Sequence, residues 1–417
     1  MPENPSTIAR QATAASEFSG RRRLVASAAV GVGLGLTGMV FYTLGLFFLP
    51  LSAEFGWTRA ELSIIPMVLT GTLIVMSPIV GSLSDKFGVR RVGLTGLVGL
   101  TLGLLLLSQA GPSLRNYYLI WLIVSIMGAG TIPVVWTRAI NAAFQRRRGL
   151  ALGLTLCGTG LSAAMVPPLL GGVIEIHGWR GGFLAMASLI LFVGLPIVFL
   201  FFHQGTSPGK ITARNGSEHD APMPDGMTFA QALNTRHFWM IAIGFLCLSL
   251  TISGVIVHMP ALLADSGLSG ERAGAMVGIV GVTILVGRLL VGFLVDRYNP
   301  PVIAFIFLSL PILSCLLLAS GTSDILVLQG AVLLLGLSAG AEVDLLAFLT
   351  NRSFGLRAYG SIYGFLLSFF SVGAGLGPLI LGLGYDANGS YQDGLIVMTV
   401  CTLVGSLCVL TLRQASA

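Results

Sequence analysis

Charged residues are scarce in this chain. Asp, Glu, Lys and Arg together make up 10% of its 417 residues, whereas soluble globular proteins carry about 25%. Hydrophobic residues make up 54%, and the mean hydropathy is +0.89. A folded chain with so few charges cannot cover itself with an ordinary water-facing surface. The composition therefore excludes a typical soluble protein and indicates an integral membrane protein.

The chain also lacks the local motifs of common enzymes. It has no glycine-rich phosphate loop with a lysine, no His/Cys set at zinc-binding spacing and no nucleophile triad. Its five cysteines all lie in long apolar runs, so we interpret them as small packing residues without a disulfide framework. The net charge of +6 is not gathered on a soluble basic face of the kind that nucleic acids bind. We therefore expect no enzyme, no cofactor and no nucleic-acid partner.

What the chain has instead is a series of long apolar runs. Each is roughly 18 to 26 residues long, enough to cross the hydrocarbon core of a membrane as a helix. Ser, Pro or Arg residues interrupt the second and the eighth run. The twelve predicted spans are residues 24–50, 61–83, 92–110, 117–142, 149–173, 182–203, 237–263, 272–295, 301–319, 325–349, 359–381 and 391–412.

Lys and Arg are distributed unevenly between the predicted loops. If the N-terminus is cytoplasmic, most basic groups, from Arg21 to Arg413, face the cytoplasm, as the positive-inside rule requires. The apolar stretch after Arg23 is too long for the core of a signal peptide and ends without a small-residue cleavage site, so we expect it to remain as the first span. Both termini are then cytoplasmic. The compact chain without long glycosylated loops favours the bacterial inner membrane.

The two halves of the chain repeat each other at a shift of 211 residues. Because this shift contains six predicted spans, an even number, both halves have the same orientation in the membrane. We expect an all-α membrane fold of twelve helices in two parallel-repeat six-helix bundles, residues 24–203 and 237–412. A cytoplasmic tail (1–23), a polar linker (204–236) and a second tail (413–417) complete the chain. The aligned pairs are Glu54–Asp265, Gly56–Gly267, Asp85–Asp296, Gly149–Gly360, Gly153–Gly364, Pro167–Pro378, Gly171–Gly382 and Glu175–Asp386.

A charged motif, GSLSDKFGVRR (residues 81–91), follows the second predicted span, and GFLVDRYNP (292–300) is a partial copy after the eighth. The motif resembles the signature loop of the major facilitator superfamily, which implies transport by alternating access. An acid at a helix end can pair with a base in one conformation and release it in another. The alternative is a tight basic turn that only fixes topology. The candidate motif residues are Gly81, Asp85, Lys86, Gly88, Arg90, Asp296 and Arg297.

Three further segments narrow the resemblance. FGWTRAELS (55–63), RRRGLALG (146–153) and GRLLVGFLVDR (287–297) are similar to the monocarboxylate porters and the oxalate/formate antiporter group. This resemblance associates Arg288, in the eighth span, with a substrate carboxylate. The chain has Ile284 where animal monocarboxylate porters have an acid, and its first span lacks their DGGWGW-like signature. The resemblance therefore implies an organic anion without identifying it.

Four charged residues lie well inside predicted spans: Arg138, Arg288, Glu342 and Asp344. A charge near mid-bilayer costs about 2.5 to 3.5 kcal/mol on insertion scales, so such residues normally face a cavity or a partner. Arginine keeps its charge, and its planar fork suits a carboxylate, so the two arginines are candidate anion-binding residues or halves of fixed ion pairs. The two acids are candidate proton carriers or the other halves of such pairs.

The fourth span carries a polar stripe at helical spacing. Thr131, Arg138 and Asn141 would share one face of a continuous helix. If this face lines a central cavity, Glu342 lies at the matching cavity position of the tenth span, because it follows Thr131 by 211 residues. Asp344, on another face of that helix, would point toward a neighbouring helix.

Other polar and aromatic side chains in the spans are candidate substrate contacts, with packing as the alternative for each. His258, near the outer end of the seventh span, is a candidate gate or proton relay because histidine titrates near neutral pH, or else a hydrogen-bonded packing residue. The candidate contacts are Tyr42, Trp136, Asn141, Gln329 and Tyr363.

These observations predict a secondary active transporter that acts as a monomer in the lipid bilayer. Its predicted cargo is a small organic anion, in particular a monocarboxylate, moved together with protons. The nearer alternative is a proton-coupled exporter of amphipathic or cationic compounds, in which Glu342 recognises the positive charge of the cargo. A binding protein that senses a ligand without moving it is a more distant alternative, and it would need an additional soluble signalling domain.

Overall fold

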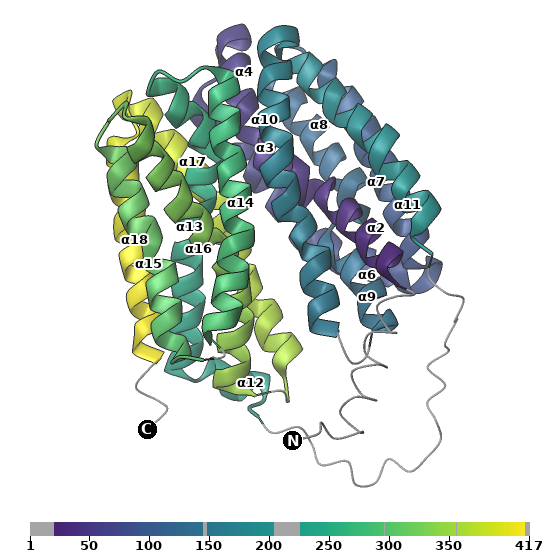
Figure 1. Cartoon of the computed structure of the whole chain (residues 1–417), viewed down its shortest axis with the longest axis vertical. Helices are drawn as coiled ribbons and strands as arrows, with labels where there is room; N and C mark the ends of the chain where they lie inside the picture. The colour runs from purple at the N-terminus through teal and green to yellow at the C-terminus, as the bar shows by residue number, and fades with distance from the viewer. Residues whose placement is uncertain (1–20, 145–147, 204–225, 296, 356, 413–417) are drawn as a thin grey trace, which may run out of the picture. The chain divides into compact units, whose positions relative to one another are not determined.

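The computed structural model describes residues 21–144, 148–203, 226–295, 297–355 and 357–412 (Figure 1). In these ranges the chain is almost entirely helical, apart from one β-bridge between Gly226 and Gly355. Helices satisfy their own backbone hydrogen bonds, which the hydrocarbon core of a membrane requires. Eleven helical stretches in the described residues are long and apolar enough to cross a membrane.

One of these stretches contains two spans. It covers 52 residues, from Leu150 to Phe201, about twice the length that one crossing needs. Inside it two helices meet at Gly178, whose φ of 70° and ψ of 178° lie outside the helical region. Glycine adopts this positive φ without steric cost. The described residues therefore contain the twelve predicted spans.

The chain divides into two compact units that differ from the two sequence halves in two short segments. Unit 1 comprises residues 1–57, 72–204 and 269–281, and unit 2 comprises residues 58–71, 205–268 and 282–417. Residues 58–71, at the start of span 2, thus belong with the second half, and residues 269–281, at the start of span 8, belong with the first. The two segments begin 211 residues apart, so this exchange follows the sequence repeat.

Unit 1 is built mainly from spans 1 to 6, and small residues let its helices approach closely. A Cβ atom at Gly33 would lie 2.6 Å from the carbonyl oxygen of Gly158, on the facing helix. Two helices contribute to both units, α6 (Ile64–Phe87) and α14 (Gly270–Val295). The remaining elements of unit 1 are α2 (Arg22–Gly33), η1 (Leu36–Val40), α3 (Phe41–Thr43), η2 (Leu44–Phe47), α4 (Phe48–Phe55), α7 (Val89–Ser108), α8 (Leu114–Met127), η3 (Gly128–Thr131), α9 (Pro133–Ala143), α10 (Arg148–Leu189), η4 (Ile190–Gly194) and α11 (Leu195–Phe201).

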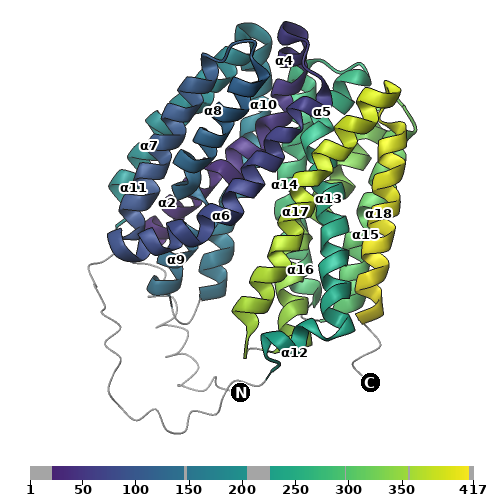
Figure 2. The same cartoon turned by 180° about the vertical axis from the view of Figure 1, so that it is seen from behind.

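Unit 2 is built from spans 7 to 12 together with the start of span 2. Besides parts of α6 and α14, its helices are α5 (Arg59–Leu62), α12 (Phe229–Leu233), α13 (Arg236–Asp265), α15 (Pro300–Ala319), α16 (Ile325–Phe354), α17 (Tyr359–Asn388) and α18 (Gln392–Leu410). α13 packs against α17 and α18, and α15 packs against α16 and α18 (Figures 1 and 2). Their buried apolar side chains, such as Phe238, Phe245 and Leu346, form the core of this unit.

Spans 1 and 4 are interrupted, and their interruptions meet inside unit 1. Span 1 breaks at Gly35, whose backbone is extended with φ −88° and ψ −171°. Span 4 narrows to the 3-10 turn η3, which ends at Thr131, and Ile132 is extended with φ −68° and ψ 156°. The Leu36 N–H donates a hydrogen bond to Thr131 Oγ1 at 3.1 Å. The Thr131 side chain, at the break in span 4, thus caps the helix that follows the break in span 1.

Candidate functional site

Two of the predicted membrane charges form an ion pair in unit 2. Arg288 on α14 and Asp344 on α16 place Nε and Oδ2 3.1 Å apart. In the described part of the chain, this Nε has no hydrogen-bond partner of good geometry. The Nε–Oδ2 contact is therefore an ion pair without a well-directed hydrogen bond from this nitrogen. An arrangement of this kind leaves the guanidinium fork available to another anion.

Two glycines bring α14 and α16 into backbone contact beside this pair. A Cβ atom at Gly340 would collide with the carbonyl oxygen of Ile284, and a Cβ atom at Gly287 would collide with the backbone of α16. Gly287 directly precedes Arg288, and Gly340 lies one helical turn before Asp344. Small residues at a helix crossing permit this approach in membranes. The crossing therefore determines where the base and the acid meet.

Glu342 lies beside this pair without belonging to it. Only 9% of the residue is exposed, and its Oε2 has no hydrogen-bond partner among the described residues. Ser338, one turn earlier on the same face of α16, also has a buried hydroxyl without a partner there. Glu342 is near enough to Arg288 to feel its charge, although the two form no ion pair. A buried carboxyl without a fixed partner is suited to accept a proton.

An aromatic pair on α17 lies near the same charges. Tyr359 and Tyr363 stack with ring centroids 5.6 Å apart and ring planes at 7°. Tyr363 is half-buried and near enough to Asp344 to feel its charge. Gln329, by contrast, precedes Glu342 by thirteen residues on α16, which is about 20 Å along the helix axis. Of these two candidate contacts, only Tyr363 lies near the predicted charges.

Arg138 has a different position from Arg288. In unit 1 its guanidinium forms an ion pair with Asp85 of the signature motif, and the two side chains are 44% and 56% exposed. The fixed-pair alternative describes this arrangement, so we do not include Arg138 in the proposed anion site. The prediction that Thr131, Arg138 and Asn141 share one helix face is wrong, because η3 and the extended Ile132 interrupt the helix. Symmetry with Thr131 therefore no longer places Glu342 in a cavity.

The other described motif residues lie near the ends of α6, α7 and α14. Arg90 donates from Nη2 to the Phe199 carbonyl oxygen at 2.6 Å. Gly88 begins the turn into α7 with φ 85°, a conformation that favours glycine. Gly81 and Lys86 lie in the last part of α6, and Arg297 follows α14 with its guanidinium 4.1 Å from the Phe293 ring centroid. Asp296 lies outside the described residues. The conformational role of this set stays a prediction.

The remaining candidate contacts lie in unit 1. Trp136 is fully buried, and its indole N–H donates to the Thr131 carbonyl oxygen at 3.0 Å. Its ring covers Gly93, where a Cβ atom would lie 2.7 Å from it, so Trp136 is a packing residue in this conformation. Tyr42 and Asn141 are half-buried, and their roles stay predictions.

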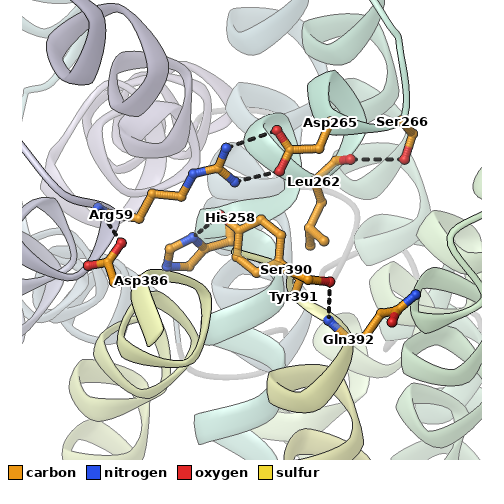
Figure 3. Close-up of polar contacts among 9 residues, drawn as sticks. All are labelled: Arg59, His258, Leu262, Asp265, Ser266, Asp386, Ser390, Tyr391 and Gln392. Atoms are coloured by element: carbon orange, nitrogen blue, oxygen red, sulfur yellow. Dashed lines mark hydrogen bonds and ion pairs between the residues drawn. The ribbon is translucent and has the colours of Figure 1, made fainter. Parts of the chain in front are cut away.

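An ionic cluster that the sequence did not reveal lies at one end of unit 2 (Figure 3). Arg59, at the start of α5, donates to both carboxylate oxygens of Asp265, at the end of α13, with N–O distances of 2.7 and 2.9 Å. Its guanidinium carbon lies 3.6 Å from the ring centroid of Tyr385 and 4.9 Å from that of Tyr391. The Arg59 side chain is only 9% exposed. A bidentate pair enclosed by aromatic rings is stronger than an exposed one.

Asp386, at the end of α17, caps the start of α5. Its Oδ1 accepts a hydrogen bond from the Arg59 N–H at 3.1 Å, and its Oδ2 accepts one from the Ala60 N–H at 2.9 Å. These N–H groups have no acceptor within their own helix and lie at its positive end. The carboxylate therefore satisfies both and ties span 2 to span 11.

His258 on α13 completes this cluster and is fully buried. Its Nε2 lies 2.9 Å from both Ser63 Oγ and the Pro378 carbonyl oxygen, and its Nδ1 lies 2.8 Å from the Tyr391 hydroxyl. The Pro378 oxygen can only accept, and the Ser63 hydroxyl donates to the Arg59 carbonyl at 2.6 Å. The network therefore assigns the hydrogen to Nε2. A phenol keeps its hydrogen at neutral pH, so the Tyr391 hydroxyl donates it to Nδ1.

The sequence alone assigned Arg59 no role beyond its place in the segment FGWTRAELS (55–63). One available signal was the repeat, which aligned Glu54 with Asp265 and Glu175 with Asp386 and so marked both acids of the cluster. Another was the segment Thr58–Glu61, which forms a capping box at the start of α5. Neither signal shows which base meets which acid.

A helical chain with twelve spans and charged groups inside them is typical of membrane transporters. Residues 30–378 match the Major Facilitator Superfamily, and the chain belongs to this superfamily. The predicted fold class is thereby confirmed. The nucleoside transporter NupG has a similar solved structure, with a TM-score of 0.73 and 15% identity over 93% of this chain and 99% of that one. A bacterial homolog of the human lysosomal transporter Spinster gives a TM-score of 0.66 at 15% identity, over 95% and 97%.

Several relatives carry names that refer to organic acids. Monocarboxylate transporter 13 of Bos taurus is 26% identical over 380 residues, covering 89% of this chain and 85% of the relative. Monocarboxylate transporter 11 of Mus musculus is 26% identical over 408 residues, covering 94% and 87%. The gallate transporter of Pseudomonas putida is 26% identical over 388 residues, covering 81% and 83%. The chain is thus a membrane transporter and not an enzyme.

Proposed function

We propose that this transporter moves a small organic anion, in particular a monocarboxylate, together with protons by alternating access. The observation that carries the proposal is the group on α14 and α16, where the Arg288–Asp344 ion pair lies beside Glu342, whose Oε2 has no partner among the described residues. The names of the monocarboxylate and gallate transporters support an organic acid as cargo.

Arg288 is the proposed anion-binding residue. Its guanidinium stays charged at all physiological pH values, so in the membrane it needs an anionic partner at every stage of the cycle. Asp344 supplies that partner in this conformation. A substrate carboxylate offers two oxygens to the same planar fork and can replace Asp344 without leaving the base uncompensated. The stacked Tyr359 and Tyr363 provide apolar surface for the organic part of the cargo.

Glu342 is the proposed proton-coupling residue. Its Oε2 has no partner among the described residues that would hold it as an anion, and a lone buried carboxylate is costly. A proton that enters with the substrate removes this cost, and it is released again when the site opens to the other side. One proton moved with each monoanion makes the cycle electroneutral, so the pH gradient alone drives accumulation. Asp344 and His258 remain alternative proton-coupling positions.

The proposed setting is the bacterial inner membrane, with the protein acting as a monomer and both termini in the cytoplasm. The distribution of Lys and Arg between the loops supports this orientation. The gallate transporter of Pseudomonas putida is a bacterial relative, although other relatives come from animals.

The test is flux into proteoliposomes with a panel of carboxylates, driven by an inwardly directed proton gradient. We expect Arg288→Ala to lower both gradient-driven uptake and substrate exchange by about a hundredfold, because an ion-pairing interaction of about 2 to 3 kcal/mol is removed. Glu342→Gln is expected to abolish gradient-driven accumulation while exchange without a gradient persists, because the variant residue is neutral in every state.

Arg115→Gln and Asp393→Asn are matched controls, because they remove the same charges at exposed positions. Both should transport like the wild type. If carboxylate flux is unchanged in Arg288→Ala and Glu342→Gln, the site assignment is wrong. If the wild type moves no carboxylate and Glu342→Gln abolishes efflux of a cationic dye that Arg288→Ala still exports, the protein is a cation exporter.

A further inference from the structure

The cap on span 2 has a counterpart elsewhere in the chain. Asp386, at the end of span 11, caps the start of span 2 through the Ala60 N–H. In unit 1, Glu175, in span 5, accepts a hydrogen bond from the Glu271 N–H at the start of span 8, with an N–O distance of 3.1 Å. Both the acids and the capped residues are 211 positions apart. The repeat therefore builds the same contact twice, once within each unit.

The aligned acids at the ends of spans 1 and 7, Glu54 and Asp265, have different kinds of partner. Glu54 is paired with Arg180 at 2.7 Å and accepts a hydrogen bond from the Trp179 indole at 2.6 Å, so its partners come from the same half of the sequence. The residue 211 positions after Arg180 is Tyr391, which carries no positive charge. Asp265 pairs instead with Arg59 of span 2, which comes from the first half of the sequence.

The surroundings of the two caps also differ, because only the cap of span 2 lies next to a network of polar side chains among the described residues. In unit 2 the carbonyl oxygen of Pro378 lies against His258, which also contacts Ser63 of span 2. In unit 1 the corresponding Pro167 carbonyl faces Gly274, where a Cβ atom would lie 2.6 Å from the oxygen. Glycine packing thus replaces the polar network at the start of span 8. The start of span 2 is held by charge and hydrogen bonds, whereas the start of span 8 is held mainly by backbone contact.

We propose that Arg59, Ser63, His258, Asp265, Asp386, Tyr385 and Tyr391 form a lock, here called the span-2 lock, which must release before this end of the transporter opens. In unit 2 this end is opposite to Leu412, near the C-terminus. With the proposed cytoplasmic C-terminus, it faces the outside of the cell.

The lock acts on the conformational cycle and not on the substrate. The start of span 2, residues 58–71, belongs to unit 2, where the lock holds it, and the same helix continues into unit 1 from residue 72. Alternating access requires such contacts to break and re-form in each cycle. Opening returns the Arg59 and Asp265 charges to water, which offsets the loss of their ion pair. The lock therefore sets the population of the open state without preventing opening.

The asymmetry defines the experiment. The probe is a single cysteine, Leu69→Cys, in a background without the five native cysteines; Leu69 is 3% exposed and belongs to the span-2 segment of unit 2. The measurement is its labelling rate by a membrane-impermeant maleimide added outside intact cells. In Arg59→Gln/Asp265→Asn we expect labelling about tenfold faster than in the parent, because the closed state loses the two charged hydrogen bonds of the bidentate pair. The matched control Glu54→Gln/Arg180→Gln, in the first half, should label at the parental rate.

The double substitution removes both charges, so no buried charge is left unpaired when the protein folds. Asp386→Ala and Glu175→Ala extend the comparison to the two caps, and the first should speed labelling more than the second. Each variant is also purified in detergent, and only variants that are monodisperse there are compared in the cell labelling. The proposal is overturned if Arg59→Gln/Asp265→Asn and Asp386→Ala both label at the parental rate, or if the first-half variants speed labelling equally. Because labelling uses no substrate, this outcome is independent of whether carboxylates are transported.

Discussion

Three arginines of this chain have three different surroundings. Arg59 makes a bidentate pair with Asp265 between two tyrosine rings. Arg138 pairs with Asp85 of the signature motif. Arg288 meets Asp344 at ion-pair distance without a well-directed hydrogen bond. Since guanidinium groups stay charged, the partner and its geometry decide what each can do. The pairing of Arg288 is the one that we propose a substrate takes over.

The residue-scale prediction concerns the competition for Arg288. In the wild type, protonation of Asp344 frees the guanidinium, so carboxylate affinity should rise as pH falls. Asp344→Asn removes the competing charge at every pH. We expect the apparent Kd for the carboxylate near neutral pH to fall by about fivefold, the equivalent of about 1 kcal/mol for a partly exposed pair.

The measurement is equilibrium binding of a radiolabelled carboxylate between pH 5 and 8, with Asp393→Asn as the control. The pH dependence of binding should be weaker in Asp344→Asn than in the wild type and unchanged in the control. Weaker binding in Asp344→Asn at every pH would mean that the acid positions Arg288 and does not compete for it.

At the scale of elements, a glycine contact sets the distance between α14 and α16. A Cβ atom at Gly340 would collide with the Ile284 carbonyl oxygen, whereas a Cβ atom at Gly330, on the same helix, would meet nothing within 4 Å. We expect Gly340→Ala to lower the free energy of unfolding by about 1 to 3 kcal/mol through overpacking. Gly330→Ala should leave it unchanged or raise it by up to about 1 kcal/mol through helix propensity.

Thermal unfolding of both variants in detergent measures this difference, and carboxylate flux reports whether Arg288 keeps its position. Equal melting temperatures for the two alanine variants would show that the α14–α16 contact is not tight. A loss of stability without any loss of flux would separate the helix contact from the site.

The interrupted fourth span shows why helical periodicity misled at this scale. The segment GAGTIP, residues 128–133, combines two glycines with a proline, which weaken a helix and favour a new start at the proline. Pro133 is indeed the first residue of α9. The predicted polar stripe required a continuous helix through this segment, which the backbone does not form. The position of Thr131 is instead decided by its hydrogen bond to the Leu36 N–H in span 1.

At the scale of the whole molecule, the charge distribution predicts that both termini are cytoplasmic. A green fluorescent protein fused after the C-terminus should fluoresce, and alkaline phosphatase fused at Gly321, in the loop between α15 and α16, should be active because that loop is external. The measurement is fluorescence and phosphatase activity in whole cells, normalised to the amount of each fusion. A C-terminal fusion that does not fluoresce, together with inactive phosphatase at Gly321, would reverse the orientation and place the span-2 lock on the cytoplasmic side.

The sequence alone determined that the protein lies in a membrane, where its spans are, and that its two halves repeat each other. Scarce charge and long apolar runs indicate a membrane fold whatever the packing, because the cost of exposed polar backbone in lipid permits few alternatives. The shift of 211 residues and the GSLSDKFGVRR motif were sufficient for the superfamily. These properties are local or periodic, so they can be recognised without a structure.

Only the tertiary structure decided which charged groups meet. Arg59 and Asp265 are 206 residues apart, and Arg288 and Asp344 belong to different helices. No local pattern encodes such pairs, since each depends on helix crossings that glycines permit and on where spans bend. The exchange of the starts of spans 2 and 8 between the units likewise depends on the packing of the whole chain. Tertiary packing therefore assigns the partners that the sequence leaves open, because ion pairing requires atoms within a few ångströms.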